Sequence, residues 1–355
     1  MSAAFRLEPL EPFGARVVGV DLSSATAPPD AVLRELEREV ASRGFLIFPG
    51  QRLSSAGSAT LARVSRYFGS GVLAARHTVH PRALEDEVLR LSNRVRHGIQ
   101  GVGPQWHSDG SFERRVFSHV AFHAECMPPE GAGTEIAHLG LAFAALPARL
   151  QAEWSRLASV NAFSGAVHPL VHAHPVSGRR TLFLHLAQTG AVVRWPADAP
   201  CETSSPADRE ARRRFADLEA MNPSAGPTRE RGHTLLSADE MRDLFRTYNE
   251  LLGAHGVAYE YRASCGAHGT GDIVLLDNLA VAHRADARAH DPGAGLRILH
   301  RTTVAGTVAL DPPSASWLPP FAYIWGNPPH LEGVWLGSDD HGVGFRWNRT
   351  LPMRN

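Results

Sequence analysis

The tetrapeptide Trp106-His107-Ser108-Asp109 constrains the fold of this chain more than any other feature of the sequence. Successive side chains of an extended strand point to opposite faces, so His107 and Asp109 share a face, with Cα atoms roughly 6–7 Å apart. An imidazole and a carboxylate at that spacing can bind the same metal ion. A third ligand must come from another part of the chain, and His283 is our candidate. Two histidines and one carboxylate form a facial triad, which is typical of mononuclear non-haem iron sites and leaves coordination positions open.

A second segment, Leu296 to Val304, alternates like a strand and follows His283 in the chain. Its alternation places Arg297 and Arg301 on one face, together with the residues at 299 and 303. A guanidinium fork can grip a carboxylate with two parallel hydrogen bonds. Because the two arginines are four residues apart, their Cα atoms lie roughly 13 Å apart on a strand. We therefore expect them to bind different groups.

The His-x-Asp tripeptide by itself is weak support for a metal site. In a chain with 19 histidines, about one such tripeptide is expected by chance. The prediction therefore depends on the motifs that accompany it.

Those motifs occur in an order that resembles the taurine dioxygenase-like family of Fe(II)/2-oxoglutarate-dependent oxygenases, from about residue 5 to about residue 308. The matching segments are Leu10–Leu22, Arg43–Gln51, His77–Pro81, Trp106–Phe112, Gly131–Glu135, His172–Gly178, Leu276–Asn278, His283, and the pair Arg297 and Arg301. Nine matches in sequence order are far more specific than any one of them.

The resemblance implies a metal site and a cosubstrate site. Fe(II) would be held by His107, Asp109 and His283, and 2-oxoglutarate and O₂ would complete its ligands. Thr134 and Arg297 would bind the distal carboxylate of 2-oxoglutarate. An intact aspartate at 109 argues against a halogenase, in which that ligand position is vacant for halide.

The resemblance also implies a substrate site formed by His77, Asn93 and Arg301. The expected reaction is oxidation, above all hydroxylation, of a C–H bond of a small molecule, with release of succinate and CO₂. The substrate would be an acid, an amino-acid derivative or a specialised metabolite. One departure from the family is a longer loop, residues 289–295, between His283 and Arg297, which leaves the register of the two arginines open.

The fold that the resemblance implies is mainly β with flanking helices (α+β), built on a double-stranded β-helix, or jelly-roll, core. We expect one domain over residues 1–308, with a polar insertion at about 186–235. Residues 309–355 are rich in aromatic side chains and would pack on the same domain. Local patterns predict helices after Asp30, over 55–68, on either side of Pro147, and after a capping box at Ser237.

Composition excludes several classes of protein. Hydrophobic residues make up 43% of the chain, and 36 basic residues balance 36 acidic ones, so no nucleic-acid or anionic-membrane partner is indicated. Cys126, Cys201 and Cys265 form neither a disulfide framework nor a Cys-x-x-Cys motif. The N-terminus has no apolar signal region, and no 18-residue apolar run occurs. We expect a cytoplasmic protein, and homo-oligomerisation stays open.

Two other classes remain as alternatives. The first is a jelly-roll metal-binding protein without catalytic activity, although a decayed site should have lost some of its ligands. The second is a zinc hydrolase that uses the histidines at 168, 172, 174 and 185. Their spacing is not that of a zinc-binding helix, and no cysteine joins them. We favour a structural role for this cluster.

Overall fold

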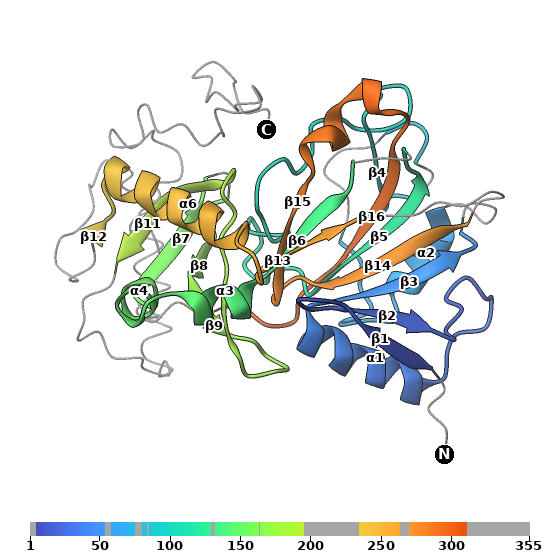
Figure 1. Ribbon diagram of the computed structural model, residues 1–355, viewed down its shortest axis with the longest axis horizontal. Helices are drawn as coiled ribbons and strands as arrows, with labels where there is room; N and C mark the ends of the chain where they lie inside the picture. The colour runs from blue at the N-terminus through green and yellow to red at the C-terminus, as the bar shows by residue number, and fades with distance from the viewer. Residues whose placement is uncertain are drawn as a thin grey trace, which may run out of the picture.

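Seven strands form the largest sheet of the computed structural model, in the order β1-β2-β3-β14-β5-β16-β4 (Figure 1). Its strands are β1 (Arg6–Pro9), β2 (Ala15–Val18), β3 (Phe45–Gln51), β4 (Leu89–Ser92), β5 (His119–Cys126), β14 (Gly271–Asp277) and β16 (Ile298–Val304). All pairs are antiparallel except β2 with β3. The structure describes residues 5–53, 58–74, 80–83, 85–128, 132–162, 164–194, 234–262 and 270–310.

Three smaller sheets complete the β structure. One contains β13 (Ala258–Tyr261), β6 (Thr134–His138) and β15 (Val281–Ala285); another contains β12 (Thr234–Leu235), β11 (Thr189–Arg194), β7 (Leu157–Asn161) and β8 (Val167–Pro169); the last is the hairpin of β9 (Val171–Ala173) and β10 (Arg180–Leu182). The helices are α1 (Asp30–Arg43), α2 (Ser58–Ser65), α3 (Leu139–Ala145), α4 (Ala148–Trp154) and α6 (Ala238–Leu252), with short 3₁₀ turns η3 (Ala287–His290) and η4 (Pro292–Ala294). The chain is thus mainly β with flanking helices, as the sequence predicts.

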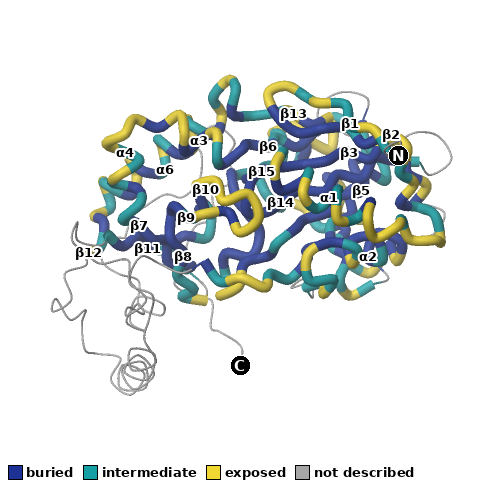
Figure 2. The backbone as a smooth tube through the Cα atoms, turned by 90° about the horizontal axis from the view of Figure 1, so that it is seen from below, coloured by how far each residue is buried: buried dark blue, intermediate teal, exposed yellow. Residues whose placement is uncertain are grey.

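Each face of the seven-stranded sheet is covered by a different layer. On strand β5, Val120 and Phe122 point to one face and pack with Ile136 and Val281 of the three-stranded sheet. Ala121 points to the other face, which α1 and α2 cover. The central strands are accordingly buried, whereas the outer sides of α1 and α2 are exposed (Figure 2). This alternation follows from the two-residue period of a strand.

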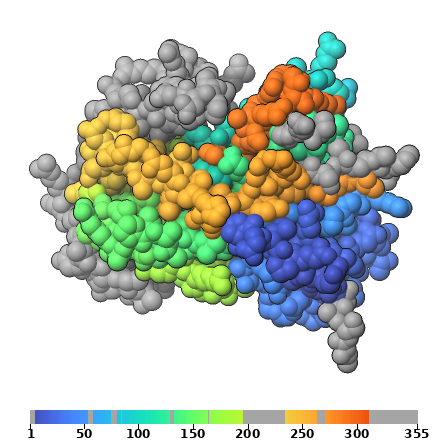
Figure 3. Space-filling view, in the orientation of Figure 1, coloured from blue at the N-terminus to red at the C-terminus, as the bar shows by residue number. Residues whose placement is uncertain are grey.

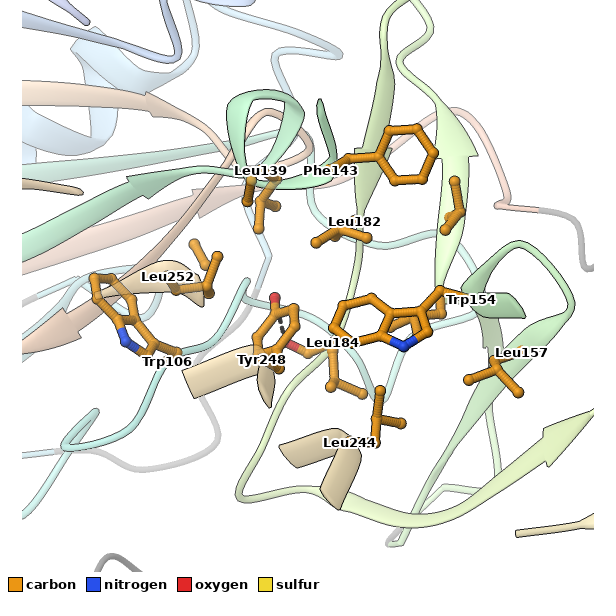
Figure 4. Packing of buried hydrophobic residues seen from close by; sticks show 14 of the residues in the cluster. Trp106, Leu139, Phe143, Trp154, Leu157, Leu182, Leu184, Leu244, Tyr248 and Leu252 are labelled. Carbon is orange, nitrogen blue, oxygen red and sulfur yellow. Dashed lines mark hydrogen bonds between the residues drawn. The ribbon is translucent and has the colours of Figure 1, made fainter. Parts of the chain in front are cut away.

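A separate core lies beneath α6, which crosses the second half of the molecule (Figures 1 and 3). The predicted capping box at Ser237 is present, and Met241, Leu244, Tyr248 and Leu252 are buried at helical spacing. Figure 4 shows Leu244, Tyr248 and Leu252 among residues of α3, α4 and the four-stranded sheet; the Tyr248 hydroxyl donates to the Leu184 carbonyl. Trp106 belongs to this core, so the metal motif connects the core beneath α6 with the part of the molecule that contains the seven-stranded sheet.

Several local predictions are confirmed. The helix that begins at Asp30 ends before Gly44, whose φ of 85° suits glycine. Pro147 separates α3 from α4, as expected from its missing N–H donor. Most of the predicted insertion (195–233) and almost all of the C-terminal extension (311–355) lie outside the described residues, although 186–194 include β11, which pairs with β7. No helix within the described ranges is long and apolar enough to cross a membrane.

Candidate metal centre

An isolated pair of backbone hydrogen bonds brings His107 and His283 together. The His107 N–H donates to the His283 carbonyl (3.1 Å), and the His283 N–H donates to the His107 carbonyl (2.8 Å). His283 lies in β15, which pairs with β6 and is thereby fixed against the main core. The two rings lie with their centroids 4.3 Å apart. The sequence-predicted partnership of these two histidines is therefore present.

Asp109 lies in a turn immediately after this bridge rather than in an extended strand. Its carboxylate nevertheless faces both histidines: Oδ1 is 3.9 Å from His107 Nε2, and Oδ2 is 3.9 Å from His283 Nε2. One ligand atom from each residue lies within 4.8 Å of the others, and all three residues are buried. In the part of the chain that the structure describes, this is the only group of histidine, cysteine and acidic residues that meets this criterion.

The protonation states suit a divalent cation. Burial lowers the pKa of both His107 and His283, which favours neutral imidazoles. His107 donates its Nδ1–H to the Gln105 carbonyl (2.7 Å), which leaves the Nε2 lone pair for a ligand. Burial alone would raise the pKa of Asp109, but Arg301 and the neighbouring histidines outweigh it, so the pKa lies below its usual value. Buried Asp109 Oδ2 has no hydrogen-bond partner within the described ranges. Two neutral nitrogens and an unsatisfied carboxylate oxygen fit Fe(II).

Gly103 keeps the space beside the metal-facing nitrogen clear. A Cβ at this position would lie 3.0 Å from His107 Cε1 and 3.6 Å from His107 Nε2. The φ of Gly103 is +74°, a conformation that other residues rarely adopt. Its carbonyl accepts a hydrogen bond from the Ala285 N–H (2.6 Å), which fixes the loop against β15. The backbone thus passes close to the centre without a side chain in the way.

Arg297 is a buried cation without a carboxylate partner among the described residues. It is 5% exposed, and its Nε donates to the Ala132 carbonyl (3.0 Å). Burial lowers its pKa to about 10, with Asp286 giving only partial compensation. A buried guanidinium needs an anion, so this is a binding position for a carboxylate. Thr134 begins β6 two residues after Ala132 and is also buried.

Arg301 lies at the metal centre itself. Its Nη1 donates to Asp109 Oδ1 (2.9 Å), while its buried Nε has no hydrogen-bond partner in the part of the chain that the structure describes. β16 begins at Ile298, so Arg297 lies just before the strand rather than on it, and Arg301 lies within the strand. The two arginines have different contacts, and the expectation that they bind different groups stays a prediction.

Asn93 holds the loop that precedes Arg297. Its Nδ2 donates to the carbonyls of Asp291 (2.9 Å) and Gly295 (2.6 Å), and its Oδ1 accepts from the Arg297 N–H (3.0 Å). The residue that we predicted to contact substrate thus fixes the longer loop, and its substrate contact stays a prediction. His77 lies outside the described residues.

The histidines of the second cluster are separated in the structure. His168 donates to the Ser111 carbonyl (2.9 Å), His172 bonds the Thr181 hydroxyl (3.0 Å), and His174 bonds Asp277 Oδ2 (3.0 Å). His168 and His172 therefore each have one ring nitrogen bonded by the protein, and His174 has both, because its Nδ1 also accepts from the N–H groups of Val176 and Ser177. Because the described residues contain no zinc-like grouping of these side chains, the zinc-hydrolase alternative is not supported.

His185 is the one member of that cluster that reaches the metal centre. Its ring centroid lies 5.0 Å from that of His107, and its buried Nδ1 has no hydrogen-bond partner. Burial lowers its pKa to about 3. Its carbonyl accepts bonds from the N–H groups of Gln188 and Thr189 and from the Thr189 hydroxyl, which fix the backbone. No local pattern in the sequence distinguishes it from its neighbours in the cluster, so its place at the centre was missed.

Known proteins resemble this chain in sequence and in fold. A family model described as "Taurine catabolism dioxygenase TauD, TfdA family" matches residues 6–303. An alpha-ketoglutarate-dependent 2,4-dichlorophenoxyacetate dioxygenase of Cupriavidus pinatubonensis is 28% identical over 211 residues, which are 50% of this chain and 71% of the relative. A protein of the same name from a Burkholderia species is 26% identical over 88% of this chain and 97% of its own length.

Solved structures agree at the level of the fold. The crystal structure of a taurine dioxygenase from Burkholderia xenovorans superposes with a TM-score of 0.60 at 21% identity, covering 86% of this chain and 91% of that one.

Proposed function

The chain belongs to the TauD, TfdA family, and from that membership and its metal centre we propose that it is an Fe(II)- and 2-oxoglutarate-dependent dioxygenase. The proposed reaction is hydroxylation of a C–H bond in a small organic acid. The observation that carries the proposal is the convergence of His107, Asp109 and His283, buried and with ligand atoms within 4.8 Å of one another.

The fold supports the proposal. The seven-stranded and three-stranded sheets pack face to face around one core, and the triad lies where β15 meets the segment before β5. We propose that these two sheets form the double-stranded β-helix of the family. The short sheet would then carry the third ligand toward the first two.

Protein side chains supply the binding and orientation. His107, Asp109 and His283 would hold Fe(II), which with 2-oxoglutarate supplies the oxidising chemistry toward O₂ and the release of succinate and CO₂. Arg297 and Thr134 would bind the distal carboxylate of 2-oxoglutarate, because a buried guanidinium that forms no ion pair with a carboxylate of the described residues can bind one from a ligand. The buried surroundings of the triad exclude bulk water.

Arg301 favours an anionic substrate. Its buried Nε has no hydrogen-bond partner among the described residues, and its Nη1 contacts a metal ligand, so a bound anion would lie beside the metal. The relatives named above act on 2,4-dichlorophenoxyacetate, a small carboxylate. We therefore propose a small acid as substrate, with Arg301 as its anion contact and His77 and Asn93 as further candidates.

The test is an anaerobic titration of the metal-free protein with Fe(II) and 2-oxoglutarate, followed by the weak visible charge-transfer band of the chelate. The band should form in the wild-type protein and be absent in His107→Ala. A screen of small acids against O₂ consumption then identifies the substrate. Iron binding without the band would instead indicate a metal-binding protein of another kind.

A further inference from the structure

Asn278 is a buried amide whose hydrogen-bonding capacity is directed at the metal motif. Its Oδ1 accepts from the Asp109 N–H (2.8 Å), and its Nδ2 donates to the Asp109 carbonyl (2.8 Å) and to the Phe117 carbonyl (2.8 Å). The side chain is 1% exposed. One amide therefore grips both main-chain polar groups of the metal ligand and joins them to the entry of β5.

Asp109 depends on this grip because no strand holds it. The backbone of His107 is fixed by its pair of bonds with His283, but Asp109 has already turned away from that bridge. Within the described residues, no backbone group bonds the main chain of Asp109. The Asn278 amide therefore fixes the backbone of Asp109, as the pair of hydrogen bonds with His283 fixes the backbone of His107.

Asn278 is itself held in place on both sides. Its own N–H donates to the Ser118 carbonyl (2.9 Å). The preceding Asp277 accepts from the N–H groups of Leu279 and Ala280 and bonds His174. The turn that leads into β15 is therefore anchored before it presents His283.

We infer that Asn278 is a positioning residue for the metal ligand Asp109. The inference rests on the proposed function, since it assigns Asn278 to the orientation of one member of the triad. The short segment from Asn278 to His283 would then supply the ligand His283 and also orient the ligand Asp109. The positions of these two ligands would thus be fixed by one segment. Partners of this kind outside the ligand set tune metal affinity by roughly 10–100-fold when they are replaced.

Two variants separate positioning from charge. Asn278→Ala removes the hydrogen bonds that the side chain forms with Asp109 and Phe117. Asn278→Asp keeps the shape and an acceptor for the Asp109 N–H, but it loses both donated bonds and adds a negative charge near the site. Charge alone would strengthen binding of a dication, whereas loss of positioning weakens it. Ser65→Ala is the matched control, because Ser65 is a buried residue whose hydroxyl bonds Leu61 and Thr302 on the helix-covered face of the sheet.

The experiment measures binding of Mn(II) to the full-length chain by the EPR signal of free Mn(II), with thermal melting of each variant. Both Asn278 variants should bind Mn(II) roughly tenfold or more weakly than the wild type, and Ser65→Ala should bind it as the wild type does. A folded Asn278→Asp that binds Mn(II) equally or more tightly overturns the inference. If wild type fails to bind Mn(II), or Asp109→Ala binds it equally well, the proposed function fails and the inference fails with it.

A measurement on the wild-type chain covers the case in which the variants do not fold. The Asp109 amide should resist hydrogen exchange in the absence of metal, because Asn278 already accepts its hydrogen bond. Exchange at the rate of an unstructured peptide would overturn the inference.

Discussion

Two groups of histidines, one in the metal triad and one in the segment 168–174, differ in geometry rather than in chemistry. His107 and His283 face one carboxylate, with each Nε2 3.9 Å from an oxygen of Asp109. His168 and His172 each bond a different protein group through one nitrogen, and His174 bonds Asp277 through Nε2 and accepts hydrogen bonds from the N–H groups of Val176 and Ser177 at Nδ1. Burial lowers the pKa of His107 and His283 in the first group and of His168 and His172 in the second, to about 4 for His168 and about 3 for His172.

A buried nitrogen without a hydrogen-bond partner does not by itself mark a metal ligand. His168 Nδ1 and His172 Nδ1 are buried without a hydrogen-bond partner, as is His283 Nδ1. Only the triad adds convergence of several donor atoms on one point. Donor atoms that converge on one point can bind one cation together, whereas an isolated buried imidazole simply stays neutral.

The largest effect that tests this contrast is removal of a triad ligand. His107→Ala or Asp109→Ala should abolish iron-dependent turnover and weaken Fe(II) binding beyond the roughly 10–100-fold range of residues outside the ligand set. His172→Ala, in the other group, should leave Fe(II) affinity unchanged. Equal losses in the three variants, measured by anaerobic Fe(II) titration, would show that the contrast is wrong.

Buried arginines allow the same comparison for anion binding. Arg297→Ala should raise the Kd for 2-oxoglutarate by roughly 10–150-fold, because a charge-assisted contact contributes about 1.5–3 kcal/mol. Arg90 is also buried but has both terminal nitrogens on Glu125 at 3.0 Å. Arg90→Ala should destabilise the fold and leave that Kd unchanged. The Kd is measured by titration of the visible chelate band. If the Kd for 2-oxoglutarate is unchanged in Arg297→Ala, the cosubstrate role moves to Arg301.

His185 belongs to the second cluster in the sequence but lies beside His107 in the structure. It therefore tests which histidines near the centre act as metal ligands. Because it is not among the converging ligand atoms, His185→Ala should change the Kd for Fe(II) by less than roughly tenfold, the lower end of the range for partners outside the ligand set. His185→Phe, which keeps a ring against His107, is the matched variant. A loss as large as that of His107→Ala would make His185 a ligand.

The smallest effect concerns pH. His172 is neutral in the folded protein down to a pKa of about 3, because burial disfavours its charged form. The unfolded chain takes up that proton near pH 6.5, so it binds more protons than the folded chain between those values. The free energy of unfolding therefore falls on acidification in this window, by about 1.4 kcal/mol per pH unit. His172→Phe should make the slope shallower by that amount between pH 5 and 6 in chemical denaturation; an unchanged slope would contradict it.

The ends and caps of the helices depend on residues that are close in the chain, so they could be predicted from the sequence. The stop at Gly44, the break at Pro147 and the capping box at Ser237 depend on φ preferences, a missing donor and a bond over three residues. The choice of His107 and Asp109 also rests on a two-residue spacing. That spacing predicted a shared face, although Asp109 reaches it from a turn.

The candidate ligand types, the alternation of the strands and the caps of the helices could be predicted from the sequence, because they depend on residues a few positions apart. Tertiary contacts fix the backbone pairing of His283 with His107, the contact of Arg301 with Asp109, the position of His185 beside His107 and the hydrogen bonds between Asn278 and Asp109. Those contacts join segments far apart in the chain. They are fixed by sheet register and by packing between sheets, in which a shift of one residue turns a side chain to the opposite face.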